Sequence, residues 1–187
     1  MKKTLIILIA CLALLERVLF DLGPNIELIT LTLILTGMYW GSRQSAIITL
    51  ILMMVSDLVI GNSSIFIFTW SGFLMGVLLT KVIGLINQSG LIRRVFVGSG
   101  VGFLANIVFY FWTNFGVWAL DKFNMYPDGI NGLYMSYING LPFLKMQLVS
   151  NLFIVPLGIV MFELVIKLND FRISCKNDYK SYIINHV

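Results

Sequence analysis

The sequence predicts an all-α integral membrane protein, a single domain with six transmembrane helices. Of its 187 residues, 58% are hydrophobic and only 12% are charged. A soluble domain is about one quarter charged, so the composition is that of a membrane protein. The apolar runs follow one another so closely that no separate soluble domain fits between them, and we expect one membrane domain.

The predicted helices are the six apolar runs of the chain. They cover approximately residues 4–20, 26–40, 45–60, 65–86, 95–120 and 143–168. The second and third runs are shorter than the ~20 residues of a perpendicular span, so we expect short helices there. Pro24 is placed to start the second helix, and Pro156 is expected to kink the sixth.

The first run contains a pattern that resembles a lipoprotein cleavage site, ending at Cys11. The apolar run continues past this cysteine, so we expect an uncleaved first helix, with cleavage as the lesser alternative.

The distribution of Lys and Arg predicts the orientation of the chain. Cytoplasmic loops of membrane proteins carry an excess of these residues. One predicted side has ten of them, and the other has only Arg17, Lys122 and Lys145. We therefore expect both termini in the cytoplasm, an extracytoplasmic loop over residues 121–142 that caps a cavity, and a cytoplasmic tail over residues 169–187.

The sequence lacks the residues that several functional classes need. The only histidine is His186, and the two cysteines, Cys11 and Cys175, lie far apart, so we expect neither a metal site nor a cofactor. No Walker A or zinc-protease motif occurs and no nucleophile has a recognisable base, so we do not expect an enzyme. The basic residues lie between apolar runs, which indicates topology rather than nucleic-acid binding.

A polar stripe follows the fifth predicted helix. Asn106, Tyr110, Asn114 and Trp118 are spaced four residues apart and therefore share one slowly turning face. Asparagine in a membrane helix is costly without a partner, so this face should point to the bundle interior or a cavity. We expect Asn106, the deepest, to bond another helix, and Asn114 and Trp118 to be the better ligand candidates.

A second group of polar residues lies near the predicted outer ends of the helices. Asp57 is in the last turn of the third helix, where a carboxylate opposes the helix dipole and needs a cation nearby. Arg17 or Lys145 is the expected partner. Arg17 is also four residues from Asp21, with which it can pair instead.

The sixth helix and the loop before it add further candidates. Gln147 and Asn151 share one face of the helix. Residues 126–129 read as a turn. A short interfacial helix is one interpretation of residues 132–140, which include Tyr134 and Tyr137. This segment is suited to cap a cavity, because tyrosine has an apolar body and a polar tip.

Small residues mark a packing face on the fourth helix, where Gly72, Gly76 and Gly84 lie at multiples of four residues. Such faces let helix backbones approach closely in a membrane. Internal packing is the favoured interpretation, and a docking face for another membrane subunit is the alternative.

Six helices with both ends inside resemble the S component, the substrate-binding subunit, of energy-coupling factor (ECF) transporters. More specifically, the chain resembles an uncharacterised bacterial six-helix membrane family placed near S components. The matching positions are residues 113–118 (TNFGVW), Tyr126-Pro127, Gly132-Leu133, Tyr137, Leu141-Pro142-Phe143, Arg17 and Ser56-Asp57. The chain departs from the pattern in its first helix, which lacks two alanines four residues apart, and at Asn151, where the family is expected to have Asp.

The resemblance implies capture of a small vitamin-like or other polar or amphipathic solute in an outward-facing cavity of a bacterial cytoplasmic membrane protein. Its partners would be ECF transmembrane and ATPase subunits or another membrane protein. The expected ligand-binding residues are Arg17, Asp57, Asn114, Trp118, Tyr134, Tyr137, Gln147 and Asn151. The alternative is a membrane scaffold that docks a partner through Gly72, Gly76 and Gly84. A small channel is disfavoured, because no polar row continues through the membrane.

Overall fold

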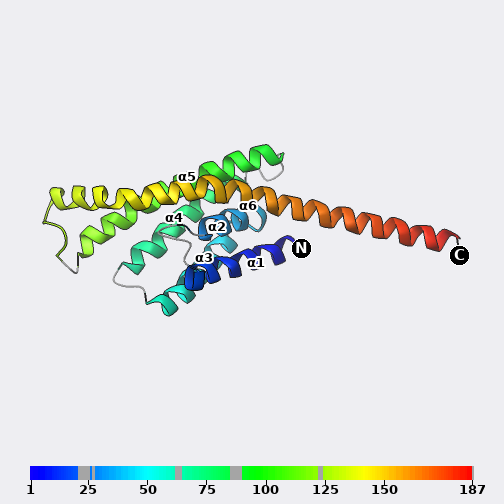
Figure 1. The fold of residues 1–187 in the computed structure, drawn as a ribbon, viewed down its shortest axis with the longest axis horizontal. Helices are drawn as coiled ribbons and strands as arrows, with labels where there is room; N and C mark the ends of the chain where they lie inside the picture. Colours follow the sequence, from blue (N-terminus) through cyan, green and yellow to red (C-terminus); the bar gives the residue numbers. More distant parts are fainter. Residues whose placement is uncertain (21–25, 27, 62–64, 85–89, 122–123, 187) are drawn as a thin grey trace.

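The structure, a computed structural model, describes residues 1–20, 26, 28–61, 65–84, 90–121 and 124–186. Its elements are all helical, which confirms the expected class (Figure 1). In chain order they are α1 Lys2–Leu15, the π-helical segment η1 Glu16–Phe20, α2 Ile29–Tyr39, α3 Ser42–Ile60, α4 Phe66–Gly84, α5 Leu91–Leu120 and α6 Ile130–His186.

Within these residues, four helices are long and apolar enough to cross a membrane, namely α3, α4, α5 and α6. The expected total of six spans therefore stays a prediction. α2 has 11 residues, or about 16 Å at 1.5 Å per residue, which agrees with the short helix expected there. α3 has 19 residues, more than expected, because it begins at Ser42.

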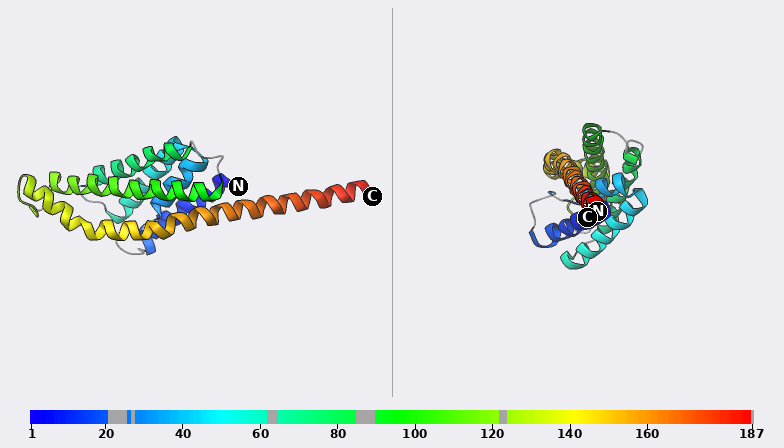
Figure 2. Two further views of the ribbon diagram at one scale, coloured as in Figure 1. Left: turned by 90° about the horizontal axis from the view of Figure 1, so that it is seen from above. Right: turned by 90° about the vertical axis from the view of Figure 1, so that its right-hand side faces the viewer.

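α2 is the central element of the bundle. Its residues 29–38 are all buried, and it contacts α1, α3, α4, α5 and α6. Two of its threonines bond to carbonyls one turn earlier: Thr32 donates to the Leu28 carbonyl at 2.9 Å and Thr36 donates to the Thr32 carbonyl at 2.7 Å. An apolar helix with such locally bonded hydroxyls can therefore serve as the core around which the others pack. The last part of α6 extends past the other helices in the view from above (Figure 2).

α6 differs most from the expectation. It is one helix of 57 residues, about 85 Å long, and it contains both the expected loop residues 130–142 and the expected tail. Pro142 and Pro156 lie inside it without ending it. The connection from α5 is thus limited to residues 121–129, and Gly129, at φ 80°, directly precedes the helix.

Close packing against α5 explains why the Gly-rich start of α6 is helical. A Cβ on Gly132 would meet Pro127 of the connection and the Trp118 indole nitrogen, and one on Gly140 would meet the side chain of Asn114. The glycines therefore let α6 approach α5 closely, as small residues do between membrane helices.

The glycines of α4 have the same role. A Cβ on Gly72 would lie 2.9 Å from the Phe109 ring, and one on Gly76 would lie 3.2 Å from the Ala105 Cβ. This face of α4 is covered by α5 within the chain, which is the internal packing that the sequence favours. Gly84 is the last residue of α4.

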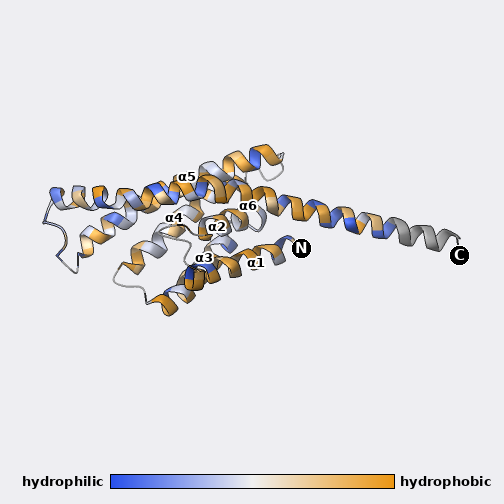
Figure 3. Cartoon of the chain, in the orientation of Figure 1, coloured by the Kyte–Doolittle hydropathy of each residue, from blue (hydrophilic) through white to orange (hydrophobic). Residues whose placement is uncertain are grey.

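Both chain ends lie away from the α5–α6 connection, and the last part of α6 extends beyond the other helices (Figure 1). Hydrophobic residues dominate α1 to α5 and the middle of α6, whereas the projecting part of α6 is mixed with hydrophilic residues (Figure 3). The α5–α6 connection therefore lies in one half of the bundle, and the chain termini lie on the side of the other half.

Candidate functional site

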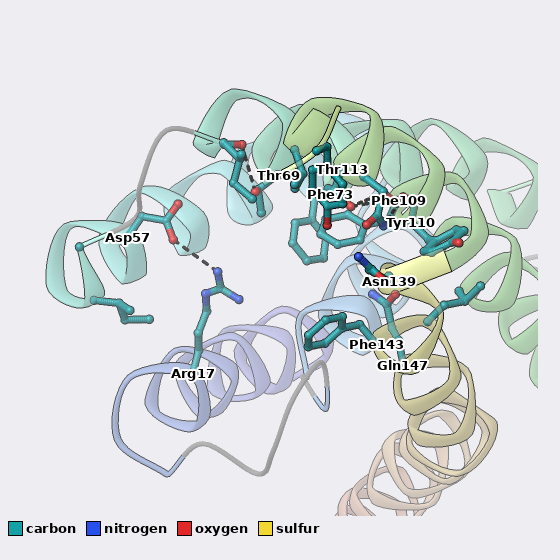
Figure 4. Close-up of a pocket in the computed structure, with 18 residues that line it drawn as sticks. Arg17, Asp57, Thr69, Phe73, Phe109, Tyr110, Thr113, Asn139, Phe143 and Gln147 are labelled. Carbon is teal, nitrogen blue, oxygen red and sulfur yellow. Dashed lines mark hydrogen bonds and ion pairs between the residues drawn. The ribbon is translucent and has the colours of Figure 1, made fainter. Parts of the chain in front are cut away.

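A cavity of about 580 Å³ lies in the half of the bundle that holds the α5–α6 connection (Figure 4). Its lining comes from η1, the end of α3, the first half of α4, the second half of α5 and the first half of α6. The polar residues of this lining are Arg17, Asp57, Thr69, Tyr110, Thr113, Asn114, Tyr126, Asn139 and Gln147.

An ion pair stands on one side of the cavity. Arg17 Nη2 lies 3.4 Å from Asp57 Oδ1, and Arg17 Nε donates to Ser56 Oγ at 3.0 Å. Trp70 Nε1 donates to the second oxygen of Asp57 at 2.6 Å. The Asp57 side chain is only 7% exposed, so these donors supply the compensation that a buried carboxylate requires. Of the two partners expected for Asp57, the structure confirms Arg17.

The π-helical segment η1 presents Arg17 to this site. It continues α1 for one wide turn, and π-helical turns occur frequently at functional sites. The preceding residue, Glu16, is buried and accepts a hydrogen bond from the Leu28 backbone N–H at 3.4 Å, which ties η1 to the start of α2. The alternative partner of Arg17, Asp21, lies outside the described residues.

The wall formed by α4 and α5 combines aromatic rings with hydroxyl groups. Phe73 and Phe109 pack with ring centroids 4.6 Å apart. Thr69 and Thr113 line the cavity beside them, and each hydroxyl donates to the carbonyl four residues earlier in the chain, at 3.2 Å and 2.8 Å respectively. This wall is therefore mainly apolar, and the two threonine hydroxyl oxygens are its hydrogen-bond acceptors.

α6 forms the opposite wall, on which Asn139, Phe143 and Gln147 are spaced four residues apart (Figure 4). Gln147 is 3% exposed. Its Nε2 has no hydrogen-bond partner among the described residues, and its side chain points from α6 into the cavity (Figure 4). Buried donors without a partner are rare in proteins, and this one lies on the wall of the cavity.

The polar stripe of α5 mainly joins α5 to α6. Asn106 Nδ2 donates to the Gln147 carbonyl at 3.3 Å, which confirms the helix–helix bond expected there. Tyr110 donates to the Tyr137 carbonyl at 2.6 Å, and Ser136 donates to the Asn114 carbonyl at 3.2 Å. The stripe is thus a hydrogen-bonded seam, and only Tyr110 and Asn114 on its edge reach the cavity.

The structure brings half of the expected ligand-binding residues together. Arg17, Asp57, Asn114 and Gln147 line the cavity. The other four lie outside the lining: Trp118, Tyr134, Tyr137 and Asn151.

Each of these four has a different position. Trp118 packs against Phe115 with ring centroids 5.7 Å apart. Tyr134 is 66% exposed on the outer surface of α6. Tyr137 donates to the Phe111 carbonyl at 3.3 Å. Asn151 is buried one turn of α6 beyond Gln147, and its Oδ1 has no partner in the described part of the chain.

Sequence reasoning missed Asn139 and the two threonines. Asn139 precedes Gln147 by two helical turns, and that spacing is a usable signal once residues 130–142 are known to be helical. No comparable signal exists for Thr69 and Thr113, because threonines facing a cavity and threonines facing a neighbouring helix have the same local sequence.

A second polar cluster lies in the opposite half of the bundle and was also missed. Arg94 Nη1 of α5 lies 3.0 Å from Glu163 Oε1 of α6, and the hydroxyl of Tyr39 on α2 donates to the same oxygen. Val155 and Ile159 of α6, both fully buried, separate this cluster from Gln147 and Asn151. Between Asn151 and Glu163, α6 carries no polar side chain.

The described residues contain no group of His, Cys, Asp and Glu that could hold a metal ion. Cys11 and Cys175 are both exposed. The chemistry that the cavity offers is thus that of hydrogen bonds, one ion pair and aromatic surface.

Comparison with known proteins gives one match. The model of a family of unknown function, DUF6580, matches residues 1–173. No curated protein and no solved structure matches the chain significantly.

Proposed function

Since the chain belongs to DUF6580, a family of unknown function, we propose its function from its own cavity. The protein binds a small polar or amphipathic solute there, for uptake across the membrane. The observation that carries this proposal is the cavity of about 580 Å³, with an ion pair on one side and, on the other, a buried amide nitrogen, Gln147 Nε2, that has no partner among the described residues.

The size and lining support a small-molecule site. Cavities of about 300–1,000 Å³ hold drug-sized ligands, and such sites combine apolar walls with a few polar groups that fix orientation. Here Phe73 and Phe109 supply the apolar wall, and Gln147 supplies a donor. A purely structural interior would not leave both a large void and an unsatisfied donor, because membrane helix interfaces are closely packed.

We further propose that the protein works as S components do, with its termini in the cytoplasm of a bacterium and the cavity facing outward. The lining residues come from the same parts of the chain that the resemblance implies, namely the ends of the first and third helices and the outer halves of the last three. ECF transmembrane and ATPase subunits, or another membrane protein, would then drive release of the solute.

Release into the cell requires a rearrangement of α5, α6 and α2. The buried residues Val155 and Ile159 and the Arg94–Glu163 pair close the other half of the bundle. Binding and release are therefore separate steps, and a partner that changes the packing of these three helices would couple them.

Mass spectrometry of small molecules released from the purified protein tests the proposal. Thr113→Phe would fill the cavity, and Leu104→Phe introduces the same ring on the exposed side of α5 as the control. We expect a defined compound in the wild type and in Leu104→Phe that is absent from Thr113→Phe, at equal thermal stability. Equal contents in all three proteins, or none in any, would refute solute binding in this cavity.

The second candidate function is that of a membrane scaffold. It is favoured by the projecting part of α6, where Leu168 and Phe171 are 67% and 70% exposed. This surface, rather than the α4 glycines that α5 covers, would hold the partner. Deletion of residues 169–187 should then abolish co-purification of a stoichiometric membrane partner while leaving the cavity and its contents unchanged.

A further inference from the structure

The chemistry of the cavity wall restricts the kind of solute that fits, if the proposed binding function holds. The charged groups in the described lining are Arg17 and Asp57, and they pair with each other. Asp57 is also bonded by Trp70. A charged solute would have to break this pair or stay without a counter-charge, and both are unfavourable away from water. The lining is therefore matched to a solute without net charge.

The α4–α5 wall requires a solute that donates hydrogen bonds. A threonine hydroxyl has one proton and two acceptor lone pairs. Thr69 and Thr113 use their protons on the carbonyls of Ile65 and Phe109. Toward the cavity these hydroxyls can therefore only accept, and the matching solute group is an N–H or O–H donor.

The α6 wall requires the opposite property. Gln147 Nε2 is a donor, is buried and has no partner among the described residues. The matching solute group is an acceptor, such as a carbonyl oxygen. Since the two walls face each other across the cavity (Figure 4), one solute can satisfy both only if it carries donor and acceptor groups together.

Aromatic residues on both walls favour a planar solute. Phe73 and Phe109 lie on the α4–α5 side, and Phe143 faces them from α6 (Figure 4). Flat rings stack or pack edge-to-face on such side chains. A planar ring between them would direct its polar edge groups toward the threonines and Gln147.

We propose that the solute is a neutral, planar ring compound of the cyclic amide class whose N–H and conjugated carbonyl stand on opposite edges of the ring, with the N–H as donor for Thr69 or Thr113 and the carbonyl as acceptor for Gln147. This inference deepens the proposed function. It specifies which wall of the cavity bonds the N–H of the solute and which wall bonds its carbonyl.

A matched series of three probes tests the inference on the full-length protein in lipid nanodiscs. Quinolin-4(1H)-one has both groups on opposite edges of its ring, 1-methylquinolin-4(1H)-one lacks the donor, and quinoline lacks both the N–H and the carbonyl. Equilibrium dialysis against protein-containing and empty nanodiscs gives each Kd. We expect the first probe to bind at least about tenfold more tightly than the other two, as one lost hydrogen bond predicts. Equal binding of the three probes, or binding of none, would overturn the inference.

Variants locate the two hydrogen bonds. Gln147→Leu should weaken the binding of quinolin-4(1H)-one about tenfold and leave that of quinoline unchanged, and Thr113→Val should act in the same way on the donor side. Thr49→Val is the control, because Thr49 is buried and its hydroxyl has no partner among the described residues, but it lies outside the cavity lining. If Gln147→Leu does not fold, Thr113→Val and the probe series still test the inference. Variants that bind quinolin-4(1H)-one as the wild type does contradict the inference.

The natural compound separates this inference from the proposed function. A released compound that is charged or a pure hydrocarbon would refute the cyclic amide class and leave solute binding established. A released neutral cyclic amide that Gln147→Leu no longer retains would support both.

Discussion

Arg17 and Asp57 are 40 positions apart in the chain, yet Arg17 Nη2 lies 3.4 Å from Asp57 Oδ1. The pair joins η1 to α3, and Trp70 extends it to α4 through its bond to the other carboxylate oxygen. Three helices are thus fixed relative to each other beside the cavity. This makes the pair both a structural connection and one wall of the proposed site.

Removing one partner of this pair should cost more stability than removing both. Arg17→Leu leaves Asp57 as a buried charge, which typically costs about 3–5 kcal/mol. Arg17→Leu with Asp57→Leu removes both charges, and we expect it to recover at least half of that loss. Unfolding in detergent by denaturant measures the four proteins of this cycle. Single-variant losses that simply add in the double variant would contradict a direct interaction.

Two glycines on α5 provide a matched test of the packing. A Cβ on Gly98 would lie 2.5 Å from Ile159 Cδ1 and 3.4 Å from Met38 Cε, whereas one on Gly100 would meet nothing within 4 Å. Gly98→Ala should therefore destabilise the protein by about 1–3 kcal/mol through overpacking.

Gly100→Ala should be neutral or stabilise by up to about 1 kcal/mol, because alanine favours the helix. Thermal unfolding of the two variants side by side measures the difference. Equal midpoints would mean that α5 does not approach α2 and α6 as closely as the structure shows.

The ion pair could be predicted from the sequence, whereas the continuity of α6 could not. Asp57 is at the C-terminal end of an apolar helix, where the helix dipole alone creates a need for a cation. The sequence predicts a loop over residues 121–142, with a short interfacial helix as one interpretation of residues 132–140, and not a helix that continues into the sixth apolar run. That continuity depends on contact with α5, for example of Gly140 with Asn114, and this contact is a property of the tertiary structure.

The tertiary structure also decides which polar residues line the cavity and which join α5 to α6. Tyr137 and Trp118 are residue types that often contact ligands, yet their positions on α6 and α5 place them outside the cavity lining. A four-residue spacing identifies a helix face but does not say what covers that face. Glu163 and Arg94 were missed for this reason, since each is an ordinary charge near the end of a helix predicted from the sequence until the fold places them 3.0 Å apart.

Glu163 should contribute to stability but not to solute binding. Glu163→Leu leaves the Arg94 guanidinium, whose side chain is 17% exposed, without its ion-pair partner, and a loss of about 3–5 kcal/mol follows. Two fully buried apolar residues separate this cluster from the cavity, so the Kd for the solute should change less than twofold.

The measurement combines thermal unfolding with equilibrium binding below the unfolding temperature. The control is Glu163→Leu with Arg94→Leu, which should recover stability because no charge remains unpaired. A weaker Kd at unchanged stability would show that the two halves of the bundle are coupled in the resting state.

The two native cysteines test the orientation of the chain. Cys175 is exposed on the projecting part of α6, nine residues or about 14 Å beyond Ile166, a buried residue of the bundle. Cys11 is exposed on α1 within the first apolar run, which we expect to lie in the hydrocarbon core, where an impermeant reagent does not reach it. A membrane-impermeant maleimide should therefore react with Cys175 in inverted vesicles and not in right-side-out vesicles.

Cys175→Ser provides the control for this labelling, since it should abolish the signal while Cys11 remains. The excess of Lys and Arg on the side of the termini is the physical reason for the expected result. Labelling in right-side-out vesicles would mean that the cavity, in the other half of the bundle, faces the cytoplasm. Capture of a solute from outside would then be impossible without a prior rearrangement, and uptake would no longer be the function that the cavity supports.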